Sequence, residues 1–225
     1  MTTLRLYSGP LSMFGAKAEI ALLEKGLEFE LIMVPFDSQD RYRPKHPEVA
    51  RINPKGQVPV LARGGLEIFD STLIFEYLED LKPEPPLWPK GAAGRAEARL
   101  LELRTDEIVF MNIVRLFGLE ETPDDPVAVA ARAAASGHYA EMEARLEARD
   151  YLAGPFTYAD IAFFMAQFYG ERKGALLTDA TPRLIDWRAR VLERPAIRQV
   201  IGRMGAWLAS KGRAVPDYLA GTLPG

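Results

Sequence analysis

Asp70 and Ser71 form a polar pair directly ahead of an apolar helical pattern. The apolar residues that follow are spaced by three and four, so a helix is expected to begin here with Asp70 or Ser71 as its N-cap. A helix N-terminus offers free backbone N–H groups and the positive end of the helix dipole, and both suit an anion. The alternative is that the pair only caps the helix. The two roles are compatible, because a cap and a ligand use different N–H groups.

Three hydroxyl side chains, those of Tyr7, Ser8 and Ser12, lie at or after the end of the first predicted strand. A hydroxyl that donates a hydrogen bond to a thiolate favours the ionised form and lowers the pKa of the thiol. The chain contains no cysteine, which excludes disulfides, thiolate metal sites and a Cys-x-x-Cys redox motif. Any sulfur chemistry must therefore use the thiol of a ligand.

The surrounding segments predict an α/β domain over residues 1–81. Runs of β-prone residues place strands at 4–8, 28–34, 58–62 and 66–69. Strong helix formers place a helix at 16–25, with residues 11–15 ahead of it as a loop. A short helix is expected near 48–52, and a longer one from Asp70 or Ser71 onward. The order β-α-β-α-β-β-α is that of a thioredoxin-like domain with a mixed four-stranded sheet.

Residues 82–94 are interpreted as a linker, because four prolines in this segment exclude a helix. From residue 95 to residue 225 the chain has few strand signals, so we expect an all-helical C-terminal domain. Its helices are predicted at 95–117, 126–149, 161–172, 182–192 and 195–208. Thr157 and Asp160 resemble a capping box at the start of the third of these helices. Asp160 is therefore interpreted as a structural residue.

The composition limits the possible functions. A formal net charge of −3 gives no electrostatic footprint for nucleic acid or for an anionic membrane. No apolar run approaches the roughly 20 residues that span a bilayer, and the first residues do not form a secretory signal. The two histidines, His46 and His138, lie far apart without a ligand-spaced partner, so no metal site is expected. We expect a cytoplasmic protein.

The segment from residue 52 to residue 80 resembles the glutathione-binding half of the glutathione S-transferase superfamily. Its Asn-Pro-x-Gly-x-Val-Pro-x-Leu pattern starts at Asn53, and a hairpin, the Asp70-Ser71 pair and an Ile/Tyr-Leu helix follow. The resemblance covers nearly the whole chain and is strongest over residues 1–80. It implies glutathione as co-substrate without a metal, a small hydrophobic electrophile as second substrate, and a homodimer.

The resemblance also implies roles in glutathione binding. In that superfamily the peptide bond before the residue matching Pro59 is cis, which turns the backbone of Val58 toward the ligand. A trans proline that opens an edge strand is the alternative. Asp70 would hold the ammonium group of glutathione, and Ser71 would add a hydroxyl for a carboxylate. The side chains of Gln57 and Lys45 are expected to reach the carboxylates, although a loop lysine is often solvated surface.

Residues 12–22 align without gaps on the pattern Ser-Pro-Phe-Gly-x-Arg-x-x-Ile-Ala-Leu of serine-type transferases. This resemblance places Ser12 at the catalytic serine. Met13 is a departure, because the family commonly has proline there. Tyr7 is the second candidate, since tyrosine-type members carry their hydroxyl at the end of strand one. The alternative for Tyr7 is an edge-strand aromatic that packs on the helical domain.

Two other resemblances leave the function open. The segments at 6–10, 24–26, 82–89 and 95–100 are similar to the stringent starvation protein A family. That family keeps the transferase fold but acts in RNA-polymerase-associated regulation without transferase activity. The Pro-His-Pro motif of that family would fall on Pro83-Glu84-Pro85, where glutamate replaces its central residue. Some bacterial β-etherases, which use glutathione to cleave lignin-type aryl ethers, match the first strand and the Ile-Asn-Pro-x-Gly-Gln-Val-Pro segment.

Overall fold

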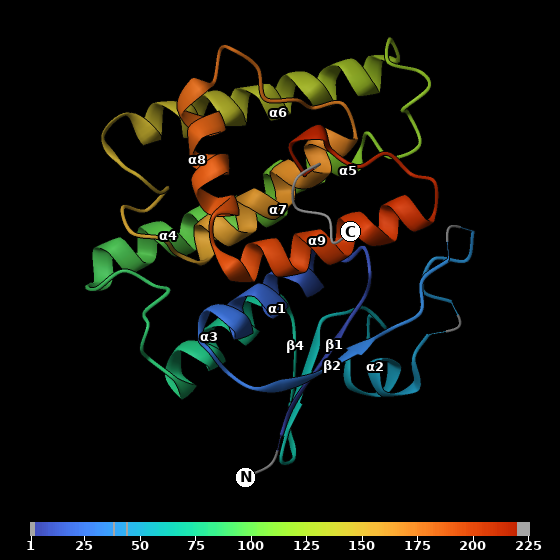
Figure 1. The fold of residues 1–225 in the computed structure, drawn as a ribbon, viewed down its shortest axis with the longest axis vertical. Coiled ribbons are helices and arrows are strands. Elements are labelled where there is room, and N and C mark those ends of the chain that lie inside the picture. Colours follow the sequence, from blue (N-terminus) through green and yellow to red (C-terminus); the bar gives the residue numbers. More distant parts are fainter. Residues whose placement is uncertain (1–2, 38, 44, 220–225) are drawn as a thin grey trace. The chain divides into compact units, whose positions relative to one another are not determined.

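The computed structural model describes residues 3–37, 39–43 and 45–219 (Figure 1). Within these residues the chain divides into two compact units. The first unit contains residues 3–86 and 199–213, and the second contains residues 87–198 and 214–219. Each unit is described separately below. The predicted boundaries at 1–81, 82–94 and 95–225 stay a prediction.

The first unit has the predicted element order. It comprises β1 (Leu4–Ser8), α1 (Met13–Glu24), β2 (Phe29–Met33), α2 (Pro47–Ile52), β3 (Val60–Arg63), β4 (Leu66–Phe69) and α3 (Ser71–Leu81). The strand order in the sheet is β2-β1-β3-β4, with β1 parallel to β2 and the other pairs antiparallel. The mixed four-stranded sheet of the thioredoxin-like prediction is therefore confirmed.

Two boundaries in this unit differ from the prediction by two residues or more. Residues 11–15 were expected to form a loop, but α1 already begins at Met13. The reason is Ser12, whose extended backbone and side-chain oxygen cap the helix at that point. Strand β3 begins at Val60 rather than at residue 58, because Pro59 has no N–H to contribute to the ladder.

The two faces of the sheet carry different side chains. Tyr7 of β1 and Val60 of β3 form a buried cluster with Val49 of α2. Successive side chains of a strand point to opposite faces, so Ser8 lies on the face opposite Tyr7. That is the face of α1, since Ser8 Oγ adjoins Gly15 of this helix. Tyr7 also lies on an inner strand of the sheet, so the alternative that treated it as an edge-strand aromatic is wrong.

Helix α9 (Pro195–Ser210) contributes most of its length to the first unit. Arg203 forms an ion pair and a hydrogen bond with Glu19, a carboxylate of α1 that is 1% exposed. Burial raises the pKa of Glu19, and the hydrogen bond and charge of Arg203 oppose that rise. Trp207 packs edge-on against Phe36, with the ring centroids 5.6 Å apart.

The second unit is helical throughout its named elements. They are α4 (Ala92–Arg104), a π-helical turn (Thr105–Val109), α5 (Phe110–Val114), α6 (Pro126–Arg145), a 3₁₀ turn (Leu146–Ala148), α7 (Tyr158–Arg172), α8 (Pro182–Leu192) and a 3₁₀ turn (Asp217–Leu219). The predicted helix at 95–117 starts earlier, at Ala92, and is interrupted by the π-helical turn. At this turn the Thr105 hydroxyl donates a 2.8 Å hydrogen bond to the carbonyl of Leu101, and such back-bonding distorts helices.

The predicted capping box at the start of α7 is confirmed. Thr157 Oγ1 accepts the N–H of Ala159, and the Asp160 carboxylate accepts the Thr157 N–H at 2.9 Å. Asp160 is fully buried and also accepts hydrogen bonds from the Leu152 N–H and the Trp187 indole, each at 2.9 Å. The side chain therefore joins three segments of the unit.

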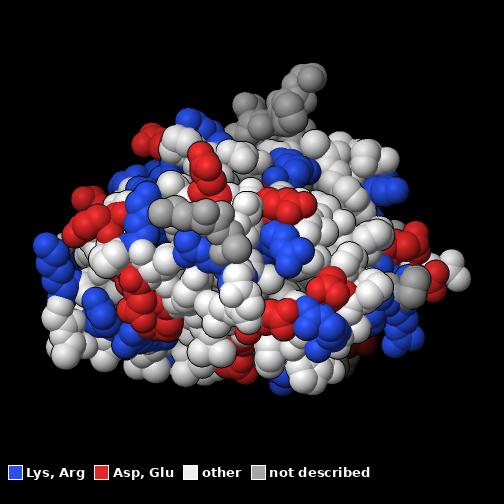
Figure 2. All heavy atoms as spheres, turned by 90° about the horizontal axis from the view of Figure 1, so that it is seen from below, with Lys and Arg blue, Asp and Glu red and all other residues white. Residues whose placement is uncertain are grey.

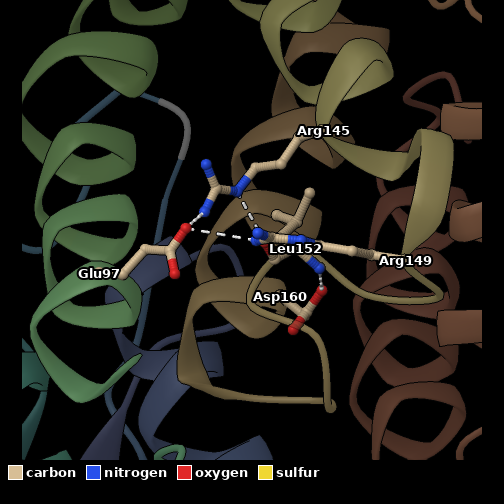
Figure 3. Close-up of polar contacts among 5 residues, drawn as sticks. All are labelled: Glu97, Arg145, Arg149, Leu152 and Asp160. Carbon is tan, nitrogen blue, oxygen red and sulfur yellow. Dashed lines mark hydrogen bonds and ion pairs between the residues drawn. The ribbon is translucent and has the colours of Figure 1, made fainter. Parts of the chain in front are cut away.

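Charged residues extend this arrangement toward the surface (Figure 3). Arg145 Nε donates to the carbonyl of Leu152 at 2.7 Å, and its guanidinium forms an ion pair with Glu97 of α4. Arg149 reaches the same Glu97 carboxylate at 3.2 Å. The loop that supplies a donor to Asp160 is thus fixed from its carbonyl side as well.

A search of the described residues finds no helix that is long and apolar enough to cross a membrane.

Candidate functional site

The strand register brings the predicted site segments to one end of the sheet. Tyr7 pairs with Val60, so the C-terminal end of β1 lies beside the N-terminal end of β3. Val60 also pairs with Phe69, so the C-terminal end of β4 lies at the same end of the sheet. The segments that adjoin these strand ends contain Ser12, Val58 and Ser71. Segments separated by almost 60 positions in the sequence therefore adjoin the same end of the sheet.

Ser12 is the N-cap of α1 and is 8% exposed. Its Oγ accepts the N–H of Gly15 at 3.0 Å, and its own N–H donates to the Gly9 carbonyl at 3.1 Å. Met13 takes the first helical position, where proline is also favoured, so the departure from the serine-type pattern is accommodated by a regular helix start. A serine hydroxyl has one hydrogen to donate, and the cap uses only its oxygen.

Asp70 is the N-cap of α3, and Ser71 is the first helical residue. The Asp70 carboxylate accepts the N–H groups of Thr72 at 2.9 Å and Leu73 at 3.4 Å. Asp70 has φ +81°, a conformation that is costly for a residue with a side chain, and such strain concentrates at functional sites. Ser71 is 3% exposed and lies at the positive end of the helix dipole.

The loop before β3 is organised by Asn53, a residue whose part the sequence analysis did not identify. The buried Asn53 side chain donates to the Gln57 carbonyl at 2.6 Å and accepts the Lys55 N–H at 3.0 Å. The Asn-Pro-x-Gly turn signal was visible in the sequence, but the cross-loop bond to Gln57 was not. Asn53 fixes the backbone immediately ahead of Val58.

Val58 and Pro59 follow this loop, and the peptide bond between them is cis, as the resemblance implied. Val58 is partly exposed and lies two residues before β3, outside the ladder of the sheet. Its N–H and C=O lie at this end of the sheet, where a ligand strand would pair by β-augmentation.

Gln57 and Lys45 are both exposed. The carbon chain of Lys45 lies against Gly56, whose added Cβ would meet its carbons at 3.4–3.5 Å. The lysine is therefore next to Gln57, although the two are 12 positions apart in the sequence. Among the residues that the structure describes, neither side chain has a hydrogen bond that would fix its charged or amide end.

Tyr7 is 3% exposed and packs within the cluster on the α2 face, with its ring 5.2 Å from that of His46. Ser8, by contrast, lies on the α1 face beside Ser12. The structure therefore brings Ser8, not Tyr7, to the cap of α1. A catalytic role for Tyr7 stays a prediction.

Charge around the first unit is mixed. On the face drawn in Figure 2, acidic and basic side chains lie interspersed without a continuous basic area. The described residues contain no group of three or more His, Asp or Glu side chains that could hold a metal ion. The arrangement offers hydrogen-bond donors and helix N-termini to a ligand with carboxylate and thiolate groups.

Two family models match this chain. The N-terminal domain of glutathione S-transferase matches residues 6–86, and the C-terminal domain of glutathione S-transferase matches residues 107–195. The chain is also 30% identical to Protein LigF of Sphingobium sp. (strain NBRC 103272 / SYK-6) over 88% of this chain and 93% of that protein. The crystal structure of LigF, described as a beta-etherase, has a TM-score of 0.73 and covers 88% of this chain and 98% of that one.

Other similarities point in two directions. A glutathione S-transferase from Methylobacterium radiotolerans, solved in complex with glutathione sulfonate, is 32% identical with a TM-score of 0.72, and covers 88% of this chain and 94% of its own. The stringent starvation protein A homolog of Coxiella burnetii is 35% identical, but the match covers only 45% of this chain and 46% of that protein.

Proposed function

This chain belongs to the glutathione S-transferase family, and we propose that it conjugates the thiolate of glutathione to a small hydrophobic electrophile, with Ser12 stabilising the thiolate. The observation that carries the proposal is the position of Ser12 as the N-cap of α1. The segments that contain Ser12, Val58 and Ser71 adjoin the same end of the sheet. One site thus holds donors for a thiolate, a peptide and a carboxylate.

Ser12 acts on the thiol equilibrium. A free thiol has a pKa of about 8.5, so most of it is protonated at neutral pH. A hydrogen bond to a charged group contributes about 1.5–3 kcal/mol, which lowers a pKa by about one or two units. The Ser12 Oγ accepts from Gly15, so its O–H is oriented away from the helix and donates to the thiolate. The thiol proton passes to solvent, and Ser12 keeps its own.

The remaining groups hold the tripeptide. The Ser71 hydroxyl and the first N–H groups of α3 bind the γ-glutamyl carboxylate, and the exposed Asp70 carboxylate holds the adjacent ammonium. The backbone of Val58 pairs with the cysteinyl residue. Gln57 and Lys45, which lie on the loops after and before α2, reach the glycyl carboxylate.

A titration with glutathione tests the proposal. Calorimetry on the wild type, Ser71→Ala and Ser12→Ala is paired with conjugation of a generic aryl electrophile. We expect the wild type to bind, Ser71→Ala to lose about tenfold or more in affinity, and Ser12→Ala to bind but to lose conjugation. Ser136→Ala, an exposed serine in α6, is the matched control and should change neither property. Absence of binding by the wild type at millimolar glutathione contradicts the proposal.

Cleavage of aryl ethers by the same thiolate is a second candidate. The similarity to LigF over nearly the whole chain favours it. A model β-aryl ether with a chromogenic phenol, assayed beside the generic electrophile, separates the two. Phenol release that depends on both glutathione and Ser12 would assign the ether as substrate.

Regulation through RNA polymerase is the third candidate. The segment Pro83-Glu84-Pro85, where the regulator motif would fall, is exposed. The buried Lys25 ammonium fixes its backbone by donating to the carbonyls of Pro83 at 3.3 Å and Pro85 at 2.7 Å. A polymerase pull-down with wild type and Glu84→Ala tests it. Capture that requires Glu84, in a protein that does not bind glutathione, would replace the transferase proposal.

We further propose a cytoplasmic homodimer. Large apolar side chains are exposed on α4, where Leu100 and Leu103, three positions apart, are 55% and 53% exposed. Contiguous exposed apolar residues mark association surfaces. Leu103→Glu should convert the dimer to a monomer in light scattering, whereas a wild-type monomer contradicts the assembly.

A further inference from the structure

Ser8 holds a buried hydroxyl that the proposed mechanism does not use. It is the last residue of β1 and is 1% exposed. Its backbone carbonyl accepts the Val34 N–H at 2.8 Å, so the backbone is fixed. Its Oγ, however, has no hydrogen-bond partner among the residues that the structure describes. A buried hydroxyl in this condition lowers stability, since it has lost its water without gaining a partner.

The hydroxyl of Ser8 lies beside that of Ser12. A Cβ added to Gly15 would come within 2.2 Å of Ser8 Oγ and within 3.0 Å of Ser12 Oγ. The two oxygens therefore lie on the same side of Gly15, no more than about 5 Å apart. A change of the Ser8 χ1 rotamer can bring the two oxygens within hydrogen-bonding distance of each other. Only glycine at position 15 leaves room for both.

The hydrogen-bonding capacity of Ser12 gives this proximity a consequence. A serine oxygen accepts two hydrogen bonds and donates one. Ser12 Oγ already accepts the Gly15 N–H at 3.0 Å. If Ser8 supplies the second bond, both acceptor positions are filled, and the single Ser12 hydrogen can only point toward the ligand. Linked hydrogen bonds also polarise one another, which strengthens the outward donor.

We propose that Ser8 is a positioning residue for the reaction, whose hydroxyl donates to Ser12 Oγ and thereby directs the Ser12 O–H at the glutathione thiolate. Ser8 does not touch the ligand itself, because its oxygen is enclosed. The inference rests on the proposed function, since it requires a thiolate beside Ser12. It gives the Ser8 hydroxyl a role at a buried position where a hydroxyl without a partner destabilises the fold.

A double-mutant cycle with Ser8→Ala and Ser12→Ala tests the inference. The readouts are the thermal midpoint, glutathione affinity by calorimetry, the pKa of the bound thiol from the ultraviolet absorbance of its thiolate, and the pH profile of conjugation. We expect Ser8→Ala to keep or raise the thermal midpoint and to bind glutathione normally. The thiolate-to-thiol ratio of bound glutathione should decrease roughly tenfold at a given pH, equivalent to a rise of one pKa unit. Conjugation should recover at high pH.

The cycle separates positioning from simple packing. If Ser8 acts through Ser12, Ser8→Ala has no further effect on the thiol pKa in the Ser12→Ala background. Ser8→Thr, which keeps the hydroxyl, should restore the wild-type pH profile if its thermal midpoint is unchanged. An unaltered thiol pKa in Ser8→Ala overturns the inference while leaving Ser12 and the proposed function intact. Failure of the wild type to bind glutathione overturns both.

Discussion

The indole Nε1 of Trp187 donates a 2.9 Å hydrogen bond to Oδ1 of Asp160, joining α8 to the N-terminus of α7. The acceptor is a carboxylate without exposed surface, and it takes further hydrogen bonds from the backbone of Leu152 and from Thr157. Burial raises the pKa of Asp160 to about 6, although each of these hydrogen bonds favours the ionised form. The stability of the second unit should therefore depend on pH through this single group.

The first prediction concerns that dependence. A carboxyl with a higher pKa in the folded than in the unfolded chain binds more protons when folded, between about pH 4 and pH 6. Its contribution to the free energy of unfolding is complete below that window and is lost as the pH rises through 6. The difference in unfolding free energy between wild type and Asp160→Asn should decrease by roughly 3 kcal/mol across the window.

Urea unfolding at several pH values measures that difference, and comparison with Asp160→Asn removes the titration of all other groups. Asp125→Asn, at the N-cap of α6, is measured in the same way as a control for the substitution itself. A penalty for Asp160→Asn that grows with rising pH would mean that the hydrogen bonds outweigh burial and that the folded pKa is low.

The second prediction concerns Gly15. Alanine normally stabilises a helix relative to glycine by about 0.8–1 kcal/mol. At position 15, however, the new methyl group would lie 2.2 Å from Ser8 Oγ and 3.0 Å from Ser12 Oγ. Overpacking of this kind costs about 1–3 kcal/mol, so Gly15→Ala should lower the free energy of unfolding and displace the Ser12 hydroxyl. Conjugation should decrease more than glutathione affinity.

Gly137→Ala in α6 is the matched control, because a Cβ there meets nothing within 4 Å. It should raise the thermal midpoint and leave conjugation unchanged. Equal stabilisation by both substitutions would show that the space beside Gly15 is not restricted.

Much of the first unit could be predicted from the sequence because its signals are local. The strand at Leu4–Ser8 and the cap at Asp70 follow from residues within a few positions, and the structure has both. The capping box of α7 is equally local, since Thr157 and Asp160 are three residues apart. Where short-range chemistry decides the structure, a single sequence is sufficient.

The differences arise where tertiary contacts decide. The unpartnered hydroxyl of Ser8 becomes apparent only when β1 and α1 are packed together. Asn53 read as turn material, but its bond to the Gln57 carbonyl depends on the folded loop. The π-helical turn at Thr105–Val109 interrupts a pattern that the sequence presents as one continuous helix. Lys25 is a further case, because it ends the predicted helix at 16–25 and is fully buried in the structure.

The third prediction separates strain from binding at Asp70. Its φ of +81° costs about 1–3 kcal/mol in a residue with a side chain, whereas replacing an N-cap by glycine costs only a few tenths. Asp70→Gly should therefore raise the free energy of unfolding by roughly 1 kcal/mol. Glutathione affinity should nevertheless decrease, because the carboxylate that we propose to hold the ammonium is gone.

Asp125→Gly is the corresponding control. Asp125 caps α6 through the Val127 N–H at 2.8 Å with an ordinary φ of −56°, so glycine there should lower stability slightly. Chemical denaturation and calorimetry on both variants give the two quantities. If Asp70→Gly is destabilised as much as Asp125→Gly, the backbone at Asp70 stores no usable strain.

The fourth prediction concerns Lys25, whose ammonium group lies 2.5 Å from the Glu79 carboxylate of α3. Its other hydrogen bonds go to the carbonyls of Pro83 and Pro85, so one buried cation fixes α1, α3 and the proline-rich segment that follows. Lys25→Met should lower the free energy of unfolding by about 3–5 kcal/mol, because it leaves a buried carboxylate without its partner. Lys25→Met/Glu79→Gln should recover part of this loss, since the unpaired buried charge is removed.

Lys90→Met, at an exposed lysine, is the control and should change the free energy of unfolding by less than about 0.5 kcal/mol. A loss for Lys25→Met no larger than this control would mean that the buried pair is energetically neutral.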